Sequence, residues 1–312
     1  MKLAAAVDIY VLHRRALGQK CEGPAVALRA FSRRHSNKTF QGIAPSDVKQ
    51  FLDVPQTGPA AWRRKYGVLR DFFSYWRCRG ELNAVPMPPS APRYTQTFVP
   101  YIYSRLELRR LLEAVPRCQR NGECRLSPAA LRTLLLFLYG TGMRIGEAIR
   151  LRLADVDLDN AVITIRGTKF YKSRLVPLGR DIVRLLREYL TTPGRWNQHY
   201  RPLFQTRQHQ AVSHRLIESA FQRLRTFAGI RRSDASSRQP RLHDLRHTFA
   251  VHRLTEWYKT GADVQKLLPA LSTYLGHVDL RSTQCYLTMT PELLKEANCR
   301  FQEYVYGGRR EQ

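Results

Sequence analysis

The sequence lacks the features of a membrane or secreted protein. Its 312 residues contain no apolar run near the ~18–20 residues that a membrane-spanning helix needs. The longest such run covers only residues 134–139. Asp8 interrupts the first apolar stretch, so no secretory signal is indicated. We therefore expect a cytoplasmic protein without a membrane partner.

Paired cysteines are also missing. The six cysteines show no C-x-x-C spacing, which argues against a zinc module and against a disulfide framework. The nine histidines are not arranged in pairs that would complete a four-ligand zinc set. We expect reduced, mostly buried thiols, and neither a metal nor another cofactor.

Acidic residues are scarce compared with basic ones. The chain has 25 Asp and Glu against 52 Lys and Arg, which gives a formal net charge of +27. Residues 1–95 hold 16 basic and 6 acidic residues, and residues 96–312 hold 36 and 19. Such a balance is typical of a protein that binds a polyanion. Because both parts of the chain are basic, we expect both to contact nucleic acid phosphates.

A proline-rich segment divides the chain. Five prolines fall within residues 84–100, which we interpret as a linker. Before it, apolar residues between 60 and 82 recur with helical spacing. We expect an all-α N-terminal domain over residues 1–93, with helices near residues 7–17, 25–34, 45–52 and 60–82.

The region after the linker combines helical patterns with two β-rich runs. The runs 161–165 and 174–178 predict a small antiparallel sheet. The fold class is therefore mainly α, with an α+β domain over residues 101–312. Its helices are expected near residues 103–114, 127–139, 143–152, 181–190, 213–227, 242–257, 263–268, 282–287 and 291–301.

Five short motifs in this second domain carry side chains that could bind or attack a phosphate. His243 and Arg246 lie three apart on a predicted helix and can face one ligand. Each candidate has a plain structural explanation when taken alone, such as an exposed cation, a helix cap or a core aromatic. The candidates are Arg144, Lys169, His243, Arg246, His277 and Tyr286.

Together the motifs resemble the tyrosine recombinase, or phage integrase, family. They run Thr141-Gly-Met-Arg-Ile-Gly-Glu147, then Lys169 before a strand, His243-Asp-Leu-Arg-His-Thr-Phe249, Leu275-Gly-His277, and Tyr286 nine residues later. The resemblance covers about residues 101–300. More weakly, the first domain is similar to the helical core-binding domain of the family, which clamps DNA.

The resemblance implies a covalent reaction on DNA. Tyr286 would attack the scissile phosphate, form a 3′-phosphotyrosyl bond and release a 5′-hydroxyl, while Arg144 and Arg246 bind the phosphate oxygens. A tyrosine hydroxyl has a pKa near ~10, so nearby cations and a base are needed to activate it. The same cations would neutralise the charge on the phosphate, which favours a mechanism without metal or ATP.

The remaining roles also follow from the resemblance. His243 would be the general base, and His277 would hydrogen-bond a non-bridging oxygen at a position where some relatives carry tryptophan. Lys169 would protonate the leaving hydroxyl, with Lys172 in the same turn as the alternative. Glu147 would hold an arginine of the site in position without itself binding the phosphate. The alternative is an ordinary salt bridge on a helix surface.

Other residues compete for these roles. Tyr274 and Tyr258 are alternative nucleophiles, and Tyr274 fits the motif spacing badly. We interpret His247 and His252 as structural or DNA-facing. The segment 257–274 is several residues longer than is common in the family, which favours recombinases carried by transposons or other mobile elements.

The sequence thus predicts a site-specific recombinase for integration, excision or transposition of a mobile element. Its partners would be double-stranded DNA recombination sites and further copies of the chain in a tetramer on DNA, with sister recombinases as a further option. The tail from about residue 291 would dock into a neighbouring subunit or pack on its own domain. Two other functions stay open: a DNA-binding accessory subunit, and a relaxing enzyme like type IB topoisomerases.

Overall fold

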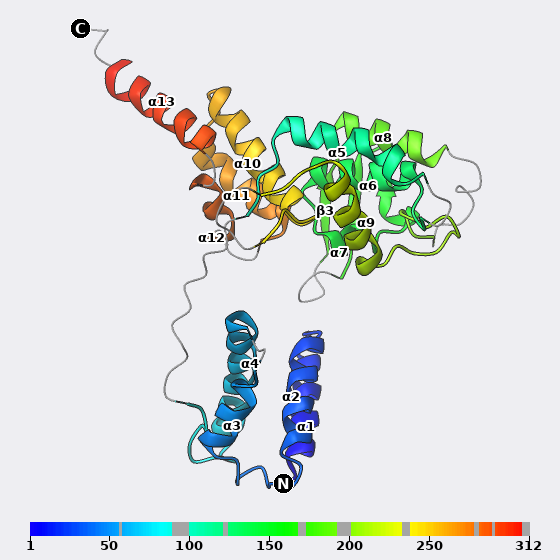
Figure 1. Ribbon diagram of the computed structural model, residues 1–312. Coiled ribbons are helices and arrows are strands. Elements are labelled where there is room, and N and C mark those ends of the chain that lie inside the picture. The colour runs from blue at the N-terminus through cyan, green and yellow to red at the C-terminus, as the bar shows by residue number, and fades with distance from the viewer. Residues whose placement is uncertain are drawn as a thin grey trace. The chain divides into compact units, whose positions relative to one another are not determined.

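The computed structural model describes residues 1–55, 58–88, 100–120, 124–167, 173–191, 201–232, 238–277, 281–288 and 291–307. These residues form two compact units, which lie on either side of segment 89–99 in the chain (Figure 1). Most of the predicted linker falls outside the described residues. No helix among the described residues is long and apolar enough to cross a membrane.

The first unit is a bundle of helices around an aromatic core. Phe31, Phe40, Phe72 and Phe73 are completely buried. Phe40 stacks on Phe73 with ring centroids 6.2 Å apart, and Phe72 meets Tyr10 edge to face at 5.4 Å. Large buried rings supply much of the apolar area that a bundle of this size needs. Its helices are α1 (Leu3–Ala16), α2 (Glu22–Arg34), α3 (Pro45–Leu52) and α4 (Pro59–Cys78).

The second unit is mostly helical, and several of its helices begin at caps that the sequence encodes. Ser104 and Glu107 form a capping box, and the Ser127 side chain accepts the N–H of Ala130. The central helix α6 is buried along most of its length and packs against α5, α8 and α10. The helices are α5 (Arg105–Cys118), α6 (Pro128–Thr141), α7 (Ile145–Ala148), α8 (Arg180–Leu190), α9 (His214–Phe227), α10 (Asp244–Lys259), α11 (Val264–Leu275), α12 (Arg281–Gln284) and α13 (Pro291–Gly307), with the 3-10 turns η1 (Leu153–Asp155) and η3 (Cys285–Thr288).

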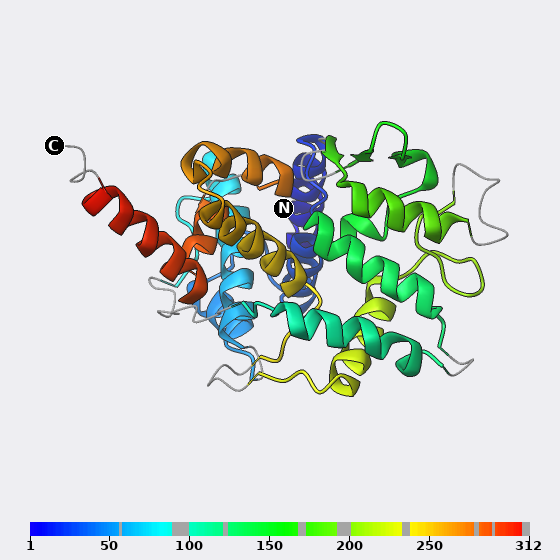
Figure 2. The ribbon, with the colours of Figure 1, turned by 90° about the horizontal axis from the view of Figure 1, so that it is seen from above.

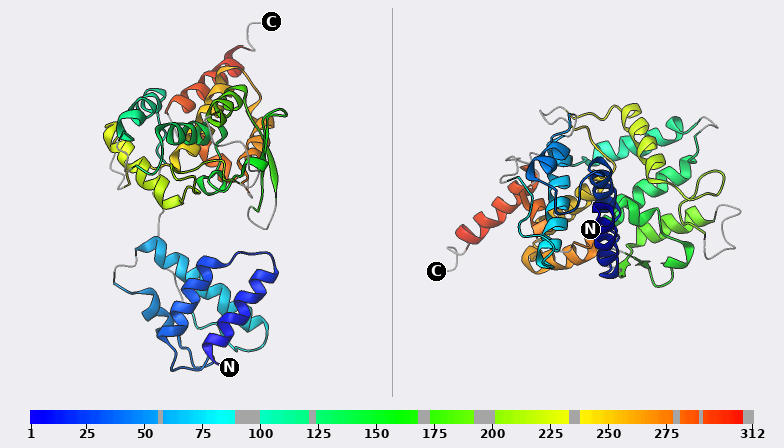
Figure 3. Two further views of the ribbon diagram at one scale, coloured as in Figure 1. Left: turned by 90° about the vertical axis from the view of Figure 1, so that its right-hand side faces the viewer. Right: turned by 90° about the horizontal axis from the view of Figure 1, so that it is seen from below.

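A small sheet lies at one edge of this unit (Figure 3). Strands β1 (Val156–Asp157), β2 (Val162–Ile165) and β3 (Arg174–Pro177) pair antiparallel in chain order. Ile165 lies opposite Arg174 in this pairing. The predicted fold class, mainly α with a small antiparallel sheet, is confirmed.

Helix α13 is the last element described. It packs against α10, and Leu293 at its start is fully buried. Further along, Leu294 and Phe301 expose 48% and 65% of their surface. Figures 1 and 2 show the helix extending outward from the rest of the second unit.

Three local predictions are wrong. The helix expected over 143–152 is only the four-residue α7, because the backbone of Leu151 and Leu153 bonds instead to Leu203 and Arg201. Helix α11 runs to residue 275, well past the expected end at 268, because residues beyond its internal proline are buried in the core. The six cysteines form no disulfide, as expected, but only Cys21 is buried, so the prediction of mostly buried thiols is wrong.

Candidate active site

Arg144 lies in the short connection between α6 and α7. Helix α6 ends at Gly142, whose left-handed conformation (φ +58°) turns the chain so that Arg144 becomes the N-cap of α7. A Cβ on Gly142 would lie 2.4 Å from the Phe249 ring, so glycine allows this close approach. The Arg144 side chain donates to Oε1 of Glu147 (3.1 Å) and to the carbonyl of Gly276 (2.9 Å).

Glu147 is a buried carboxylate that two arginines share. It accepts the backbone N–H and Nη1 of Arg144, and a bidentate pair of bonds from Arg174 at 3.1 and 2.8 Å. Burial alone would raise the pKa of Glu147, but the hydrogen bonds and charges of these arginines outweigh it and hold the pKa below its usual range. Because Glu147 is 6% exposed, its contact with Arg144 is not the helix-surface salt bridge considered as the alternative.

Arg246 projects from α10 and is 3% exposed. Its guanidinium donates to the carbonyls of Gly142 and Leu275, both at 2.8 Å. Burial and the neighbouring Arg144 cation lower its pKa to about 10, so it stays protonated at neutral pH. A buried cation held by backbone carbonyls keeps its full charge for an anionic ligand.

Three arginines therefore converge on the C-terminal end of α11. Gly276 accepts from Arg144, and Leu275 accepts from Arg246 at 2.8 Å and from Arg174 at 3.5 Å. The last carbonyls of a helix have no partner within it and lie at the negative end of its dipole. The guanidinium groups satisfy these carbonyls and are fixed in place by them.

Tyr286 lies on the turn η3 and is 2% exposed. Burial raises the pKa of its hydroxyl, while the Arg246 cation acts in the opposite direction. The hydroxyl lies 3.2 Å from Nδ1 of His247, and the His277 ring stacks near the tyrosine ring with centroids 6.1 Å apart. The structure thus brings Tyr286, Arg246 and His277 into one cluster, which includes His247 as well.

The histidines of this cluster are held neutral. Burial, followed by the surrounding cations, lowers the pKa of His247 to about 3 and that of His277 to about 4. His277 also shares a 2.7 Å hydrogen bond between Nδ1 and Thr283. His243 is the N-cap of α10, and its exposed side chain has a ring centroid 5.0 Å from that of His247. Partial desolvation and then Arg246 lower its pKa too, so a neutral imidazole is available to accept a proton.

Tyr274, Tyr258 and His252 make other contacts. The Tyr274 hydroxyl donates to the carbonyl of Pro177 at 3.4 Å, and its ring stacks on Phe249. Tyr258 is partly buried against the core around α10. His252 instead contacts the hydroxyl of Tyr139 at 2.9 Å. Lys169 and Lys172, the two candidates for the general acid, lie outside the described residues.

Two side chains of the site were not predicted from the sequence. His247 was interpreted as structural or DNA-facing, yet it contacts the candidate nucleophile. Its position four residues after His243, on the same face of α10, was the available signal. Arg174 falls at the start of the predicted strand 174–178, and no local pattern in the sequence indicates that its side chain reaches Glu147, 27 residues away in the chain.

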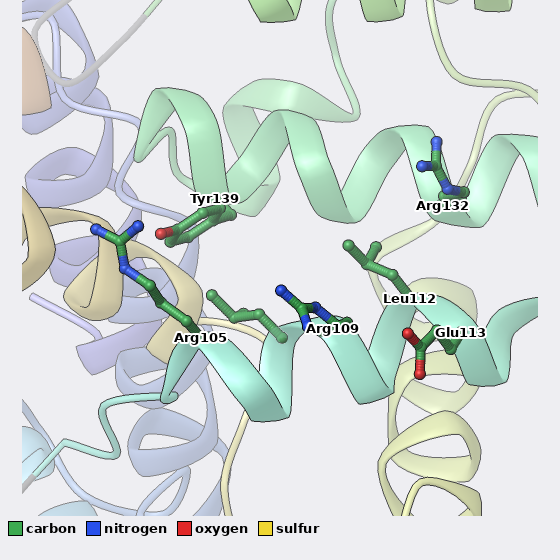
Figure 4. Close-up of a pocket in the computed structure, with 7 residues that line it drawn as sticks. Arg105, Arg109, Leu112, Glu113, Arg132 and Tyr139 are labelled. Atoms are coloured by element: carbon green, nitrogen blue, oxygen red, sulfur yellow. The ribbon is translucent and has the colours of Figure 1, made fainter.

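A separate open pocket lies between α5 and α6, with a volume of about 640 Å³. Figure 4 shows Arg105 and Arg109 of α5 facing the same space as Arg132 and Tyr139 of α6. It contains none of the predicted site residues. Among the described residues, no group of three or more His, Cys, Asp and Glu could hold a metal ion.

Comparisons with known proteins agree with the family that the sequence motifs resemble. A model of the phage integrase family matches residues 105–292. A protein of Sinorhizobium fredii, named for an inferred integrase or recombinase activity, is 37% identical over 300 residues, which are 94% of each chain. The tyrosine recombinase XerA of Thermococcus kodakarensis is 31% identical over 229 residues, 73% of this chain and 71% of that one.

A solved structure extends the comparison to the fold. The Tn1549 transposon integrase superimposes with a TM-score of 0.67, covering 96% of this chain and 99% of that chain at 15% identity. The resemblance inferred from the five motifs is confirmed by the family model and by these relatives. This chain belongs to the phage integrase family, the tyrosine recombinases.

Proposed function

We propose that this protein is a site-specific recombinase that cleaves and rejoins DNA through Tyr286. The observation that carries the proposal is the buried Tyr286 hydroxyl beside the protonated Arg246 and a cluster of neutral imidazoles. In the proposed step the Tyr286 oxygen forms a bond to phosphorus and the bond from phosphorus to the 5′-oxygen breaks. The products are a 3′-phosphotyrosine and a free 5′-hydroxyl, and a second attack by a 5′-hydroxyl reverses the step.

The contacts of the described residues support the roles proposed for Arg144, Arg246 and His243. Arg144 and Arg246 would bind the non-bridging oxygens, since both are fixed by backbone carbonyls and carry donors that point to one region. His243 would accept the proton of the tyrosine, and its lowered pKa keeps it neutral for that task. His277 would hydrogen-bond a phosphate oxygen, and Lys169 would protonate the leaving oxygen.

The fixed cations also supply the charge neutralisation that phosphoryl transfer requires. Two described guanidinium groups reach the phosphate in this proposal, and a lysine would add a third charge. We therefore propose that cleavage needs no metal ion. No ATP is needed, because the phosphotyrosyl bond conserves the energy of the phosphodiester.

Double-stranded DNA is the proposed partner. The net charge of +27 is spread over both units, which suits a protein that contacts phosphates with each of them. Solved relatives of similar fold are described as a lambda integrase dimer bound to a core site and a lambda integrase tetramer bound to a Holliday junction. We propose that this chain likewise assembles on DNA, as a tetramer at two recombination sites, alone or with sister recombinases.

A mobile element is the proposed substrate. The segment between α10 and the Leu275-Gly-His277 motif is longer than is common in the family, and it folds as the extended helix α11. The protein would then excise or integrate the DNA that encodes it, acting at the nucleoid. This assignment concerns the biological outcome only, since the chemistry at Tyr286 is the same for integration, excision and inversion.

Nicked DNA substrates built from the ends of the encoding element test the proposal. A nick next to the cleavage site lets the cleaved fragment diffuse away, which traps the covalent protein–DNA adduct. Wild type is expected to give an adduct in EDTA on a denaturing gel, Tyr286→Phe to give none, and Tyr274→Phe to behave like wild type. Both variants lose only a hydroxyl, so DNA binding should be unchanged.

The alternatives predict different outcomes. Binding without any adduct in wild type would favour an accessory subunit. An adduct together with relaxation of any supercoiled plasmid, and no junction formation, would favour a relaxing enzyme similar to type IB topoisomerases. Loss of the adduct in EDTA would contradict the metal-free step.

A further inference from the structure

Arg174 lies at the start of β3 and points from the sheet into the candidate site. Its two terminal nitrogens bind the two oxygens of Glu147 at 3.1 and 2.8 Å, and the side chain is 16% exposed. A parallel pair of bonds between a guanidinium and a carboxylate is the strongest and most directional form of this contact. Arg174 thereby links the sheet to α7, the short helix that Arg144 caps.

The Glu147 carboxylate is saturated as a result. A carboxylate offers about four acceptor positions. Here Oε1 takes one nitrogen from each arginine, and Oε2 takes Nη2 of Arg174 and the backbone N–H of Arg144. We propose that Arg174 is a positioning residue for the cleavage reaction: it neutralises and orients Glu147, so that Arg144 is held in place with its charge available to the scissile phosphate. This inference rests on the function proposed above.

The charge balance shows why a second arginine matters. Glu147 is 6% exposed, so its charge is little screened by water. With both arginines present, the group of three carries one net positive charge. Without Arg174 the carboxylate would cancel the charge of Arg144 alone, and the group would be neutral where an anionic phosphate must bind.

The fit of Arg174 against Gly276 is close. A Cβ on Gly276 would lie 2.7 Å from both Cζ and Nη1 of Arg174, so only glycine lets the backbone pass over the guanidinium there. The carbonyl of that glycine is the acceptor for Arg144, and the preceding carbonyl, of Leu275, lies 3.5 Å from Arg174. A lysine would lack the planar double contact that this geometry uses.

The test measures two quantities, the rate of adduct formation at saturating protein on nicked DNA and the affinity for the same DNA. We expect Arg174→Met to slow adduct formation about 10- to 100-fold, by analogy with the loss of groups that orient metal ligands. Affinity should change little, since one charge of a large basic surface is lost. Arg174→Lys should fall between Arg174→Met and wild type.

The double variant Arg174→Met/Glu147→Gln distinguishes a positioning role of Arg174 from a purely structural role. If Arg174 acts by neutralising Glu147, removing that negative charge should restore part of the lost rate, so the double variant should be faster than Arg174→Met. The control Arg166→Met also breaks an arginine–carboxylate pair, with Asp155, but on an exposed side chain. It should leave the rate unchanged.

The outcomes are distinguishable. A wild-type rate in Arg174→Met, or a double variant no faster than Arg174→Met, would overturn the role of Arg174 while leaving the proposed function intact. No adduct from wild type would instead overturn the proposed function. Melting temperatures of all variants show whether each remains folded, and the lysine variant and the double variant keep the test valid if Arg174→Met alone unfolds.

Discussion

The hydroxyl of Tyr286 lies 3.2 Å from Nδ1 of His247, four residues after the histidine that the family motif assigns as the base. His243 is the N-cap of α10 and His247 lies in its first turn, and their rings meet edge to face with centroids 5.0 Å apart. The pKa of His247, lowered to about 3 by burial and nearby cations, keeps it neutral. A neutral imidazole can accept one hydrogen bond, so His247 can hold the hydroxyl without taking its proton.

Replacing His247 by alanine should therefore impair the reaction more than the fold. We expect His247→Ala to slow adduct formation by about 10- to 100-fold, by analogy with the loss of groups that orient metal ligands. The loss of one hydrogen bond should lower the free energy of unfolding by about 0.5–1.5 kcal/mol. Single-turnover cleavage of nicked DNA and thermal denaturation measure the two effects.

His252 provides the matched control on the same helix. It is hydrogen-bonded to a different tyrosine, Tyr139, at 2.9 Å and lies outside the cluster around Tyr286. His252→Ala should lose a similar amount of stability and keep the wild-type cleavage rate. Equal slowing in both alanine variants would show that His247 acts only through general stability.

Gly276→Ala should disturb the arginine cluster. The residue has φ +69°, a conformation that costs a non-glycine residue about 1–2 kcal/mol, and its Cβ would also collide with Arg174. Gly261 has φ +72°, and no atom lies within 4 Å of the place that a Cβ would occupy, so Gly261→Ala has the strain without the collision. We expect both variants to melt at lower temperature, but only Gly276→Ala to lose cleavage beyond what that destabilisation explains.

Stability should fall as the solution becomes acidic. His247 and His277 have folded-state pKa values of about 3 and about 4, below the ~6.5 of an unfolded histidine. As the pH drops below ~6.5, the unfolded chain takes up protons that the folded site excludes, so the folded state loses stability. Glu147, whose pKa is also lowered, acts in the same direction at lower pH.

Melting temperatures measured from about pH 7.5 to about pH 5 check this prediction. They should decline with pH in wild type and decline less in His247→Asn, which has no imidazole to protonate in the unfolded chain. An identical decline in both proteins would mean that other groups control the acid sensitivity.

The sequence allowed the fold class to be predicted because its signals are local. The β-rich runs at 161–165 and 174–178 and the Ser127 cap depend on neighbours in the chain, and the structure has strands at 162–165 and 174–177 and the cap at Ser127. The prediction of a helix over 143–152 was wrong because the backbone near its end hydrogen-bonds to residues 201 and 203. Nothing near residue 151 in the sequence indicates that pairing. Competition from distant backbone groups cannot be recognised from local patterns.

The same limit applies to the site. Arg144, His243, Arg246, His277 and Tyr286 could be selected because their order and spacing carry a family pattern, and the structure brings them to one region. The contact between Arg174 and Glu147 joins a strand to a helix through the end of α11, and it exists only after all three have packed. Such long-range contacts are set by tertiary geometry and leave no periodic signal in the sequence.

Helix α13 offers the last prediction. Leu294 and Phe301 are 48% and 65% exposed, seven residues apart, and therefore lie on one face of the helix. If this face docks into a neighbouring subunit, as proposed for the assembly on DNA, Leu294→Glu/Phe301→Glu should leave the free protein folded and reduce its oligomeric state on DNA. Light scattering of the complexes measures this state. Leu106→Glu, at a 63% exposed leucine of α5, is the matched control and should assemble normally. Normal assembly of the double variant would instead indicate that α13 serves its own subunit through the buried contact of Leu293 with the core around α10.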